Sequence, residues 1–381
     1  MASVGILCEY NPFHLGHARQ IAGIRQHFGQ DTAIVCLMSG SFVQRGEPAI
    51  FPRLARAQAA MESGADLVLE LPPLGSLSSA EGFARAGVRF LSPVCSHLCF
   101  GTESGTAESL TATAEALLEP TFSEALRAAL STGISFPAAR QSALERMGLD
   151  TGLLARPNDI LGVEYCKAIL ELGSALTPFP IHRPGDYHAE TPDPENPSAT
   201  ALRAAILAGL PWENYLPPKA ADCLKGSPVH SLAAGERAVL YRLRTMTDAD
   251  FEALPYGSEG LWRRLMHACR EESSLEDILT AVKTKRYTRT RLNRMVLCAF
   301  LGITQDDFLY SPPYARILAF NPKGREVLKV AKQTGLYRNL GWEDGSDYCT
   351  KERQWASLYG LFRVDGPGKP GLAKKERTLI L

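Results

Sequence analysis

An excess of charge of either sign is absent from this 381-residue sequence, because 41 lysines and arginines balance 41 aspartates and glutamates. No global field draws the protein to nucleic acid or to a membrane, so a basic binding surface has to be local. No uninterrupted run of about 18 apolar residues exists, so we expect no membrane-spanning helix. The N-terminus also lacks the charged region and small-residue cleavage site of a secretory signal peptide. These absences predict a cytoplasmic protein with no membrane partner.

Cysteine occurs nine times, an odd number that disulfides cannot pair completely. Most of these cysteines lie inside apolar runs, which is typical of reduced core cysteines in the cytosol. Cys95 and Cys99 lack a second cysteine pair or a histidine cluster beside them, so we expect no protein-bound metal. Hydrophobic residues make up 45% of the chain and charged residues 22%, which is ordinary for a globular enzyme of roughly two or three domains.

Short apolar segments alternate with helical patterns in the first two hundred residues. This rhythm predicts an α/β fold with a Rossmann-like parallel sheet and helices on both of its faces. Ligands bind such sheets beyond the carboxyl ends of the strands. The expected strands are 4–8, 33–38, 67–71, 98–100 and 177–182, and the expected helices are 15–28, 54–64, 160–172 and 198–208.

The chain changes character at Pro217-Pro218, which we take as a domain boundary. Before it, residues 106–147 have a helical pattern and residues 184–197 form a Pro-rich loop. After it, the pattern is mostly helical, with a short extended stretch expected at 315–318. The sequence therefore predicts an α/β domain over residues 1–216 and a mainly α-helical domain over residues 217–381.

A compact motif follows the first predicted strand, where His14 and His17 flank Gly16 at the start of a helix. Backbone N–H groups and the helix dipole favour phosphate at such a position. Imidazoles can donate hydrogen bonds to phosphate oxygens, and glycine lets a nucleotide approach the backbone. The alternatives are incidental surface histidines or two zinc ligands, although no third ligand is clustered nearby.

This strand–HxGH–helix unit resembles the nucleotidyltransferase superfamily, which splits the α–β phosphate bond of ATP or CTP. Longer segments are similar to the bacterial tRNA(Met) cytidine acetate ligase family, namely residues 5–17, 38–50, 64–72, 100–101, 157–165, 183–188, 198–203 and 285–291. The resemblance implies that acetate and ATP, with Mg²⁺ accompanying the ATP, form acetyl-adenylate. The acetyl group then passes to N4 of the wobble cytidine of elongator tRNA(Met), giving N4-acetylcytidine. Pro52-Arg53 departs from the family pattern, in which an acidic residue and a lysine are expected.

The resemblance also implies which residues form the ATP and acetate site in the first domain. His14 and His17 are predicted to bind the phosphates and stabilise charge on the α-phosphorus. Arg45 is the third predicted catalytic residue, because a guanidinium suits a carboxylate or a phosphate. The other predicted ATP-binding residues are Ile6, Leu7, Cys8, Glu9, Tyr10, Asn11, Pro12, Phe13, Leu15, Gly16, Gly101, Asn158, Arg183, Ser198, Thr200 and Arg203.

Other interpretations of four of these residues stay open from the sequence alone. Asn158 is a natural N-cap for the helix that follows it, and Gly101 fits an ordinary turn. Arg203 either holds the departing pyrophosphate or lies on an exposed helix. Arg45 fits a solvated loop equally well.

Residues 283–294 contain six lysines and arginines and no acid. A cluster of cations with a tyrosine among them suits an RNA backbone and one stacked base. The predicted tRNA-binding residues are Lys283, Lys285, Arg286, Tyr287, Arg289, Arg291 and Arg294. The alternative is a solvated helix face neutralised by nearby acids.

Two other functions compete with a tRNA ligase. A small-molecule adenylyltransferase of the pantetheine-phosphate or nicotinate-mononucleotide kind shares HxGH but needs no basic second domain. A nucleotide-sensing RNA-binding protein would bind both ligands without turnover.

Overall fold

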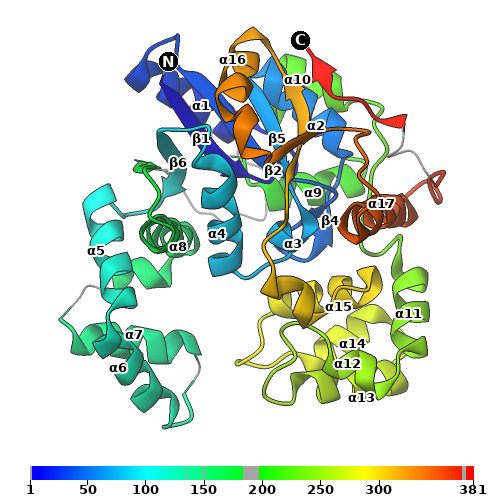
Figure 1. Cartoon of the computed structure of the whole chain (residues 1–381). Coiled ribbons are helices and arrows are strands. Elements are labelled where there is room, and N and C mark those ends of the chain that lie inside the picture. Colours follow the sequence, from blue (N-terminus) through cyan, green and yellow to red (C-terminus); the bar gives the residue numbers. More distant parts are fainter. Residues whose placement is uncertain (1, 135, 149–150, 183–196, 371–374) are drawn as a thin grey trace.

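A central sheet organises the chain in the computed structural model, which describes residues 2–134, 136–148, 151–182, 197–370 and 375–381 (Figure 1). Five of its strands are parallel and lie in the spatial order β5-β2-β1-β6-β7. They are β1 (Ser3–Cys8), β2 (Ala33–Ser39), β5 (Leu67–Leu71), β6 (His97–Thr102) and β7 (Thr177–His182). The expected Rossmann-like parallel sheet is confirmed.

The C-terminal part of the chain returns to this sheet. Strand β8 (Ala315–Phe320) pairs with β5 in the antiparallel sense. Strands β9 (Tyr337–Asn339) and β10 (Leu379–Ile380) both pair with β8 in the parallel sense. The extended stretch expected at 315–318 is therefore a sheet strand. The division of the chain at residue 217 stays a prediction, although three strands from beyond it share the sheet with β1.

Helices cover both faces of the sheet, as the alternating pattern predicts. Alternate residues of β1 point to opposite sides, so Ile6 packs in one core and Leu7 in the other. The first face is covered by α1 (Leu15–Phe28), α2 (Arg53–Glu62), α9 (Ala199–Leu207) and α10 (Pro218–Leu224). The second face is covered by α4 (Ala80–Leu91), α5 (Ala107–Leu118), α8 (Pro157–Glu171) and α16 (Pro322–Ala331).

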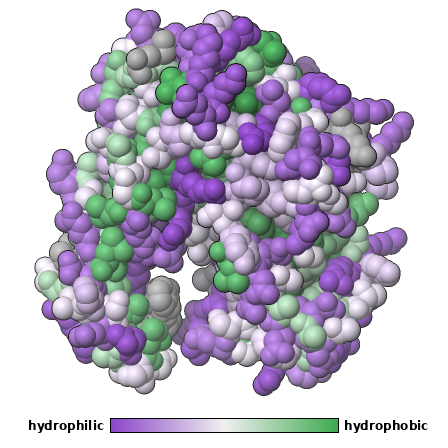
Figure 2. All heavy atoms as spheres, in the orientation of Figure 1, coloured by the Kyte–Doolittle hydropathy of each residue, from purple (hydrophilic) through white to green (hydrophobic). Residues whose placement is uncertain are grey.

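Two helical lobes project from the edge of the sheet where the parallel strands end, and Figure 2 shows the cleft between them. The first lobe contains α5, α6 (Pro120–Leu130) and α7 (Phe136–Arg146). The second lobe has its own hydrophobic core. It contains α11 (Glu236–Thr245), α12 (Asp248–Glu252), α13 (Leu261–Glu271), α14 (Leu275–Val282) and α15 (Arg289–Leu301).

Shorter elements link the sheet to the second lobe. A hairpin of β3 (Phe42–Val43) and β4 (Glu47–Pro48) follows β2, and α3 (Pro73–Ser76) follows β5. Helix α17 (Asp347–Tyr359) lies between the sheet and the lobe, where the Tyr359 hydroxyl donates to the Ala49 carbonyl at 2.7 Å.

The described residues contain no helix that is long and apolar enough to cross a membrane. The nine cysteines, all of them described, are free thiols, and most are buried.

His230 gives the fold a pH-dependent contribution to stability. Its ring stacks on Tyr359, with centroids 4.0 Å apart, and its backbone N–H donates to the Ile50 carbonyl at 2.9 Å. Burial lowers the pKa of His230 from an ordinary value of 6.5 to about 4, although backbone hydrogen bonds oppose the shift. Because only the unfolded chain gains a proton between these values, this stabilisation is complete above pH 6.5 and decreases as the pH falls towards 4.

We therefore expect the free energy of unfolding to fall by about 2 kcal/mol more between pH 7.5 and pH 5 in the wild type than in His230→Phe. Phenylalanine keeps the ring that stacks on Tyr359 but has no proton to gain. Urea unfolding at both pH values measures the difference. An equal fall in the two proteins would show that His230 does not cause it.

Candidate nucleotide-binding and catalytic site

The turn that follows β1 is held by neighbouring elements rather than by its own sequence alone. Tyr10 has a positive φ of 45° and a buried ring. The Asn11 side-chain oxygen accepts from the Ile50 N–H at 2.7 Å, and the Asn11 carbonyl accepts from Arg203 Nη1 at 2.9 Å. Arg203 is thereby brought from α9 to the histidine turn. Its role in holding phosphate or pyrophosphate stays a prediction.

His14 and His17 begin α1 as a reciprocal capping pair. Nδ1 of His14 accepts from the Gly16 N–H at 3.1 Å, and Nδ1 of His17 accepts from the His14 N–H at 3.2 Å. Since both Nδ1 atoms accept, each neutral ring carries its proton on Nε2. The rings stack with centroids 3.7 Å apart. The turn thus holds two fixed imidazoles, a buried one from His14 and a half-buried one from His17, beside the positive end of a helix dipole.

Gly16 makes room for the ring of His14. A Cβ at this position would lie 2.9 Å from Cε1 of His14, closer than real Cβ contacts allow. The sequence interpretation assigned this glycine to close approach by the nucleotide. The structure gives it a nearer reason, which is the packing of His14 over the first turn of α1.

Arg56 is an organising residue that the sequence interpretation missed. Its guanidinium is fully buried in α2 and donates to the carbonyls of Glu9 at 2.6 Å, Ser39 at 3.0 Å and Phe51 at 2.9 Å, and also to that of Gly40. The carbonyl of Glu9 follows β1, and those of Ser39 and Gly40 end or follow β2, so one side chain fixes both strand ends. Burial lowers the pKa of Arg56, and nearby acidic groups oppose that shift.

The β3–β4 hairpin carries Arg45 and lies beside the histidine turn. The Gln44 N–H donates to Glu9 Oε1 at 2.8 Å, and Glu47 lies 3.9 Å from Nε of Arg203. Arg45 itself is half-buried. The hairpin therefore joins the end of β1 to the start of α9, as expected for a loop at the carboxyl edge of the sheet.

The end of β6 is tied to the start of α8 by the carboxylates of Asp159 and Glu103. Asp159 is buried and accepts from the N–H of Glu103 at 2.9 Å and from the hydroxyl of Ser104 at 2.7 Å, as well as from the hydroxyl of Thr102. Burial opposes ionisation, but these hydrogen bonds hold the pKa of Asp159 below its ordinary value. Gly101, within β6, pairs with Ile181 of β7.

Asn158 is not the N-cap that its position suggests. Helix α8 begins at Pro157 with Arg156 as its N-cap, so Asn158 lies inside the first turn. Its side chain donates to Glu103 at 2.7 Å. The capping interpretation is therefore wrong, and the contact of Asn158 with a nucleotide stays a prediction.

The second predicted phosphate-binding segment is formed at the start of α9. Ser198 is the N-cap, with its hydroxyl accepting from the Ala201 N–H at 3.4 Å, and Thr200 Oγ1 accepts from Arg203 at 3.2 Å. Arg183 and the expected loop that follows it lie outside the residues that the structure describes.

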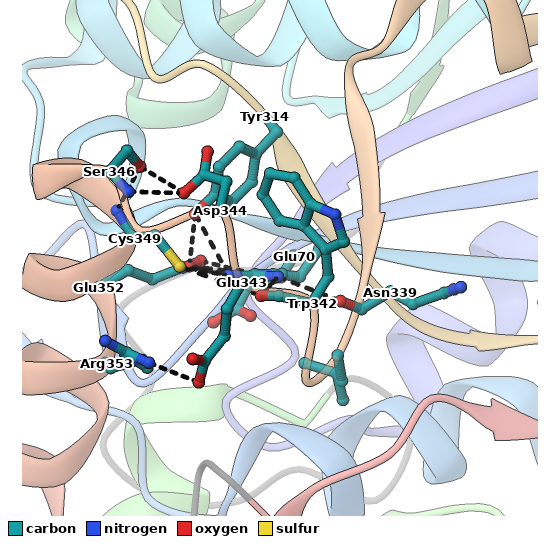
Figure 3. Close-up of polar contacts among 12 residues, drawn as sticks. Glu70, Tyr314, Asn339, Trp342, Glu343, Asp344, Ser346, Cys349, Glu352 and Arg353 are labelled. Carbon is teal, nitrogen blue, oxygen red and sulfur yellow. Dashed lines mark hydrogen bonds and ion pairs between the residues drawn. The ribbon is translucent and has the colours of Figure 1, made fainter.

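Arg53, which stands where the family pattern has lysine, is paired with two carboxylates, of which Glu70 is buried and Glu376 is half-buried. It donates to Glu70 at 2.6 Å and to Glu376 at 2.5 Å. Burial raises the pKa of Glu70, while Arg53 opposes the rise. Figure 3 shows Glu70 near Glu352, and Glu352 forms an ion pair with Arg316 at 2.5 Å. Arg53 and Arg316 line the same small cavity. Arg53 in this position anchors the C-terminal segment to the sheet.

The basic segment does not form one surface. Lys283, Lys285 and Arg286 are exposed, and Arg286 pairs with Glu259 at 2.6 Å. Tyr287 is only 8% exposed and packs in the core of the second lobe. Its ring cannot stack on an RNA base from this position, which corrects the stacking role expected from the sequence.

The remaining arginines of the segment turn towards protein partners. Arg289 pairs with Glu276 at 2.5 Å, and Arg291 donates to the Tyr256 carbonyl at 2.7 Å. Arg294 donates to the Gln44 carbonyl at 3.1 Å. The charge run is thus divided into an exposed part before Tyr287, in which Arg286 also pairs with an acid, and a half-buried part after it that binds acids and carbonyls.

A parallel sheet with paired imidazole donors at the carboxyl end of its first strand defines a nucleotidyltransferase-type enzyme. The family model described as HIGH Nucleotidyl Transferase matches residues 1–342. A tRNA(Met) cytidine acetate ligase of Clostridium perfringens is 37% identical over 87% of this chain and 88% of its own length. One of Syntrophomonas wolfei is 38% identical over 87% of this chain and 85% of its own. The chain therefore belongs to the tRNA(Met) cytidine acetate ligase family.

Solved structures agree with this assignment over the whole chain. The crystal structure of Thermotoga maritima TmcAL without ligand superposes with a TM-score of 0.90, at 29% sequence identity and complete coverage of both chains. The same protein bound with alpha-thio ATP gives a TM-score of 0.88 at 28% identity, again with complete coverage of both chains.

Proposed function

We propose that this chain is an ATP-dependent ligase that acetylates a tRNA cytidine in two steps. An oxygen of acetate attacks the α-phosphorus of ATP, and the bond between the α-phosphorus and the bridging oxygen to the β-phosphorus breaks. Pyrophosphate departs, and acetyl-adenylate is formed. N4 of the wobble cytidine of elongator tRNA(Met) then attacks the acetyl carbon, AMP departs and the nitrogen loses a proton. The products are N4-acetylcytidine, AMP and pyrophosphate.

The observation that carries this proposal is the paired histidine turn. Adenylyl transfer places negative charge on the oxygens around the α-phosphorus, so it needs preorganised donors more than covalent chemistry. The Nδ1 hydrogen bonds of His14 and His17 fix both imidazoles with their protons on Nε2. We assign these two side chains to the α-phosphate in the transition state.

Other parts of the site hold the reactants in place. Arg45 pairs with the acetate carboxylate or with the forming acetyl-phosphate bond. Arg203, Ser198 and Thr200 at the start of α9 receive the β and γ phosphates, and Gly101 and Asn158 contact the nucleoside, with Arg183 beside them. Mg²⁺ enters with ATP and is held mainly by phosphate oxygens and water, as is usual for this ion.

Pyrophosphate release tests the two-step scheme directly. The purified protein is incubated with ATP alone, with ATP and acetate, and with ATP, acetate and tRNA. The proposal predicts no release without acetate and release that is sustained when tRNA consumes the adenylate. Release that depends on a pantetheine or mononucleotide acceptor, or binding of both ligands without release, would favour the two rival functions.

The exposed cations before Tyr287 are expected to serve the second step only. Replacing Lys283, Lys285 and Arg286 together with alanine should weaken tRNA binding and lower the slope of log affinity against log salt by about 2 to 3. Activation of acetate should continue, because these side chains do not touch the histidine turn. Tyr287→Phe serves as a comparison, since a buried ring should leave tRNA affinity unchanged. Unchanged tRNA affinity in the triple variant would show that these residues are only solvated surface charges and do not bind tRNA.

A further inference from the structure

The β3–β4 hairpin is held between two parts of the molecule that have separate roles in the proposed reaction. On one side, its Gln44 N–H donates to Glu9, the first residue after β1, at 2.8 Å. On the other side, the Gln44 carbonyl accepts from Arg294 of α15 at 3.1 Å. One peptide segment therefore touches both the histidine turn and the helical lobe that carries the basic residues.

The contact with α15 is close as well as polar. Gly46 has a φ of +75°, and a Cβ added to it would lie 2.3 Å from the Arg294 backbone nitrogen and 2.5 Å from the Asn293 carbonyl carbon. The hairpin backbone thus packs directly on the helix backbone. A side chain at residue 46 would push the two apart, and the residue between the polar contact and the close contact is Arg45.

Arg294 is itself fixed from the lobe side. Its guanidinium lies over the ring of Tyr256, 5.1 Å from the centroid, and the Tyr256 hydroxyl donates to the Leu77 carbonyl at 2.6 Å. Its Nε is buried and has no partner among the described residues. A side chain held in this way is poorly placed to meet an RNA phosphate and well placed to set the position of the hairpin.

We propose that Arg294 is a positioning residue for the adenylation step: it fixes the hairpin of residues 42–48, and with it Arg45 and Glu9, relative to His14 and His17. This inference rests on the proposed function. A displacement of about 1 Å in a reacting group can lower a rate by up to about 100-fold, so loosening this loop acts on turnover rather than on nucleotide affinity.

The test compares Arg294→Met with Arg294→Lys, Gly46→Ala and the double variant Arg294→Met/Gly46→Ala. Arg270→Met, an equal change on the exposed face of the same lobe, is the matched control. Acetate-dependent pyrophosphate release is measured without tRNA, and tRNA binding is measured across a salt series. Thermal unfolding of each variant confirms that it is folded.

We expect Arg294→Met to lower kcat about tenfold, with the KM for ATP, the tRNA Kd and its salt slope all within about twofold of wild type. Lysine at 294 can still donate to the Gln44 carbonyl and should restore most of the loss. Gly46→Ala should reproduce the loss, and the double variant should be no worse than the poorer single variant, because both break one contact. If Arg294→Met does not fold, the lysine and alanine variants carry the same comparison.

Three results would overturn the inference alone: wild-type kcat in Arg294→Met, a loss confined to tRNA affinity with a salt slope lower by about 1, or losses that multiply in the double variant. A wild-type protein without acetate-dependent pyrophosphate release would overturn the proposed function and this inference with it.

Discussion

Replacing His17 with glutamine should lower acetate-dependent pyrophosphate release by about 100-fold or more. Glutamine at this position can still accept the hydrogen bond from the His14 N–H, so the start of α1 is kept. The imidazole donor is lost from its fixed position, because an amide whose oxygen accepts from the His14 N–H directs its NH₂ group elsewhere. One preorganised donor to transition-state charge is worth roughly 3 kcal/mol. Single-turnover measurements of adenylate formation without tRNA report this step directly.

His14→Asn gives the matching test at the N-cap itself. Asparagine is a strong N-cap residue and preserves the bond from the Gly16 N–H, while it removes the imidazole. We expect a loss similar to that of His17→Gln, with a melting temperature within a few degrees of wild type. Near wild-type pyrophosphate release in both folded variants would show that these histidines do not stabilise the transition state.

Arg56→Met should destabilise the protein by about 3 to 5 kcal/mol. The arginine is fully buried, and methionine of similar length would leave the carbonyls of Glu9, Ser39, Gly40 and Phe51 without their donor. A buried polar group that loses its partner costs about 1 to 3 kcal/mol, and several are lost together. The same change loosens the ends of β1 and β2, so activity should fall as well.

Urea unfolding of Arg56→Met and wild type measures this loss. Arg19→Met, an equal change at an exposed position of α1, should alter the free energy of unfolding by less than about 0.5 kcal/mol. A loss below about 1 kcal/mol in Arg56→Met would show that water replaces the guanidinium and that Arg56 does not organise the strand ends.

Local patterns in the sequence were sufficient to predict the elements nearest the histidine turn. Residues 15–28 coincide with α1, and the five expected strands correspond to β1, β2, β5, β6 and β7. Apolar runs bounded by polar turns carry this information within a few residues. The pairing of β8 with β5 depends on contacts across about 250 residues of chain, and the local pattern does not identify that partner.

Side-chain direction was the harder part of the site to predict. Arg56 belongs to a helix rich in alanine and arginine, where an exposed arginine is the ordinary expectation, yet tertiary packing encloses it. Side-chain direction was also not predictable in the basic segment, because its composition indicated only a single run of cations. The helix geometry of α15 turns Arg291 and Arg294 inwards, whereas Lys283 and Lys285 precede this helix and are exposed.

The prediction that Asn158 is an N-cap is wrong for a related reason. A polar residue before a helical pattern favours an N-cap, but Pro157 already occupies the first helical position. The carboxylate that accepts hydrogen bonds from the first N–H groups of α8 belongs to Glu103, which directly follows β6. Only the fold brings that acid to the helix.

The most direct measurement of the central claim is mass spectrometry of tRNA nucleosides after incubation of the protein with ATP, isotopically labelled acetate and elongator tRNA(Met). We predict labelled N4-acetylcytidine at the wobble position, formed only when ATP and acetate are both present and absent with His17→Gln. Unlabelled cytidine at that position, in a sample where the same enzyme preparation binds ATP and tRNA, would contradict the assignment of this chain as an acetate ligase.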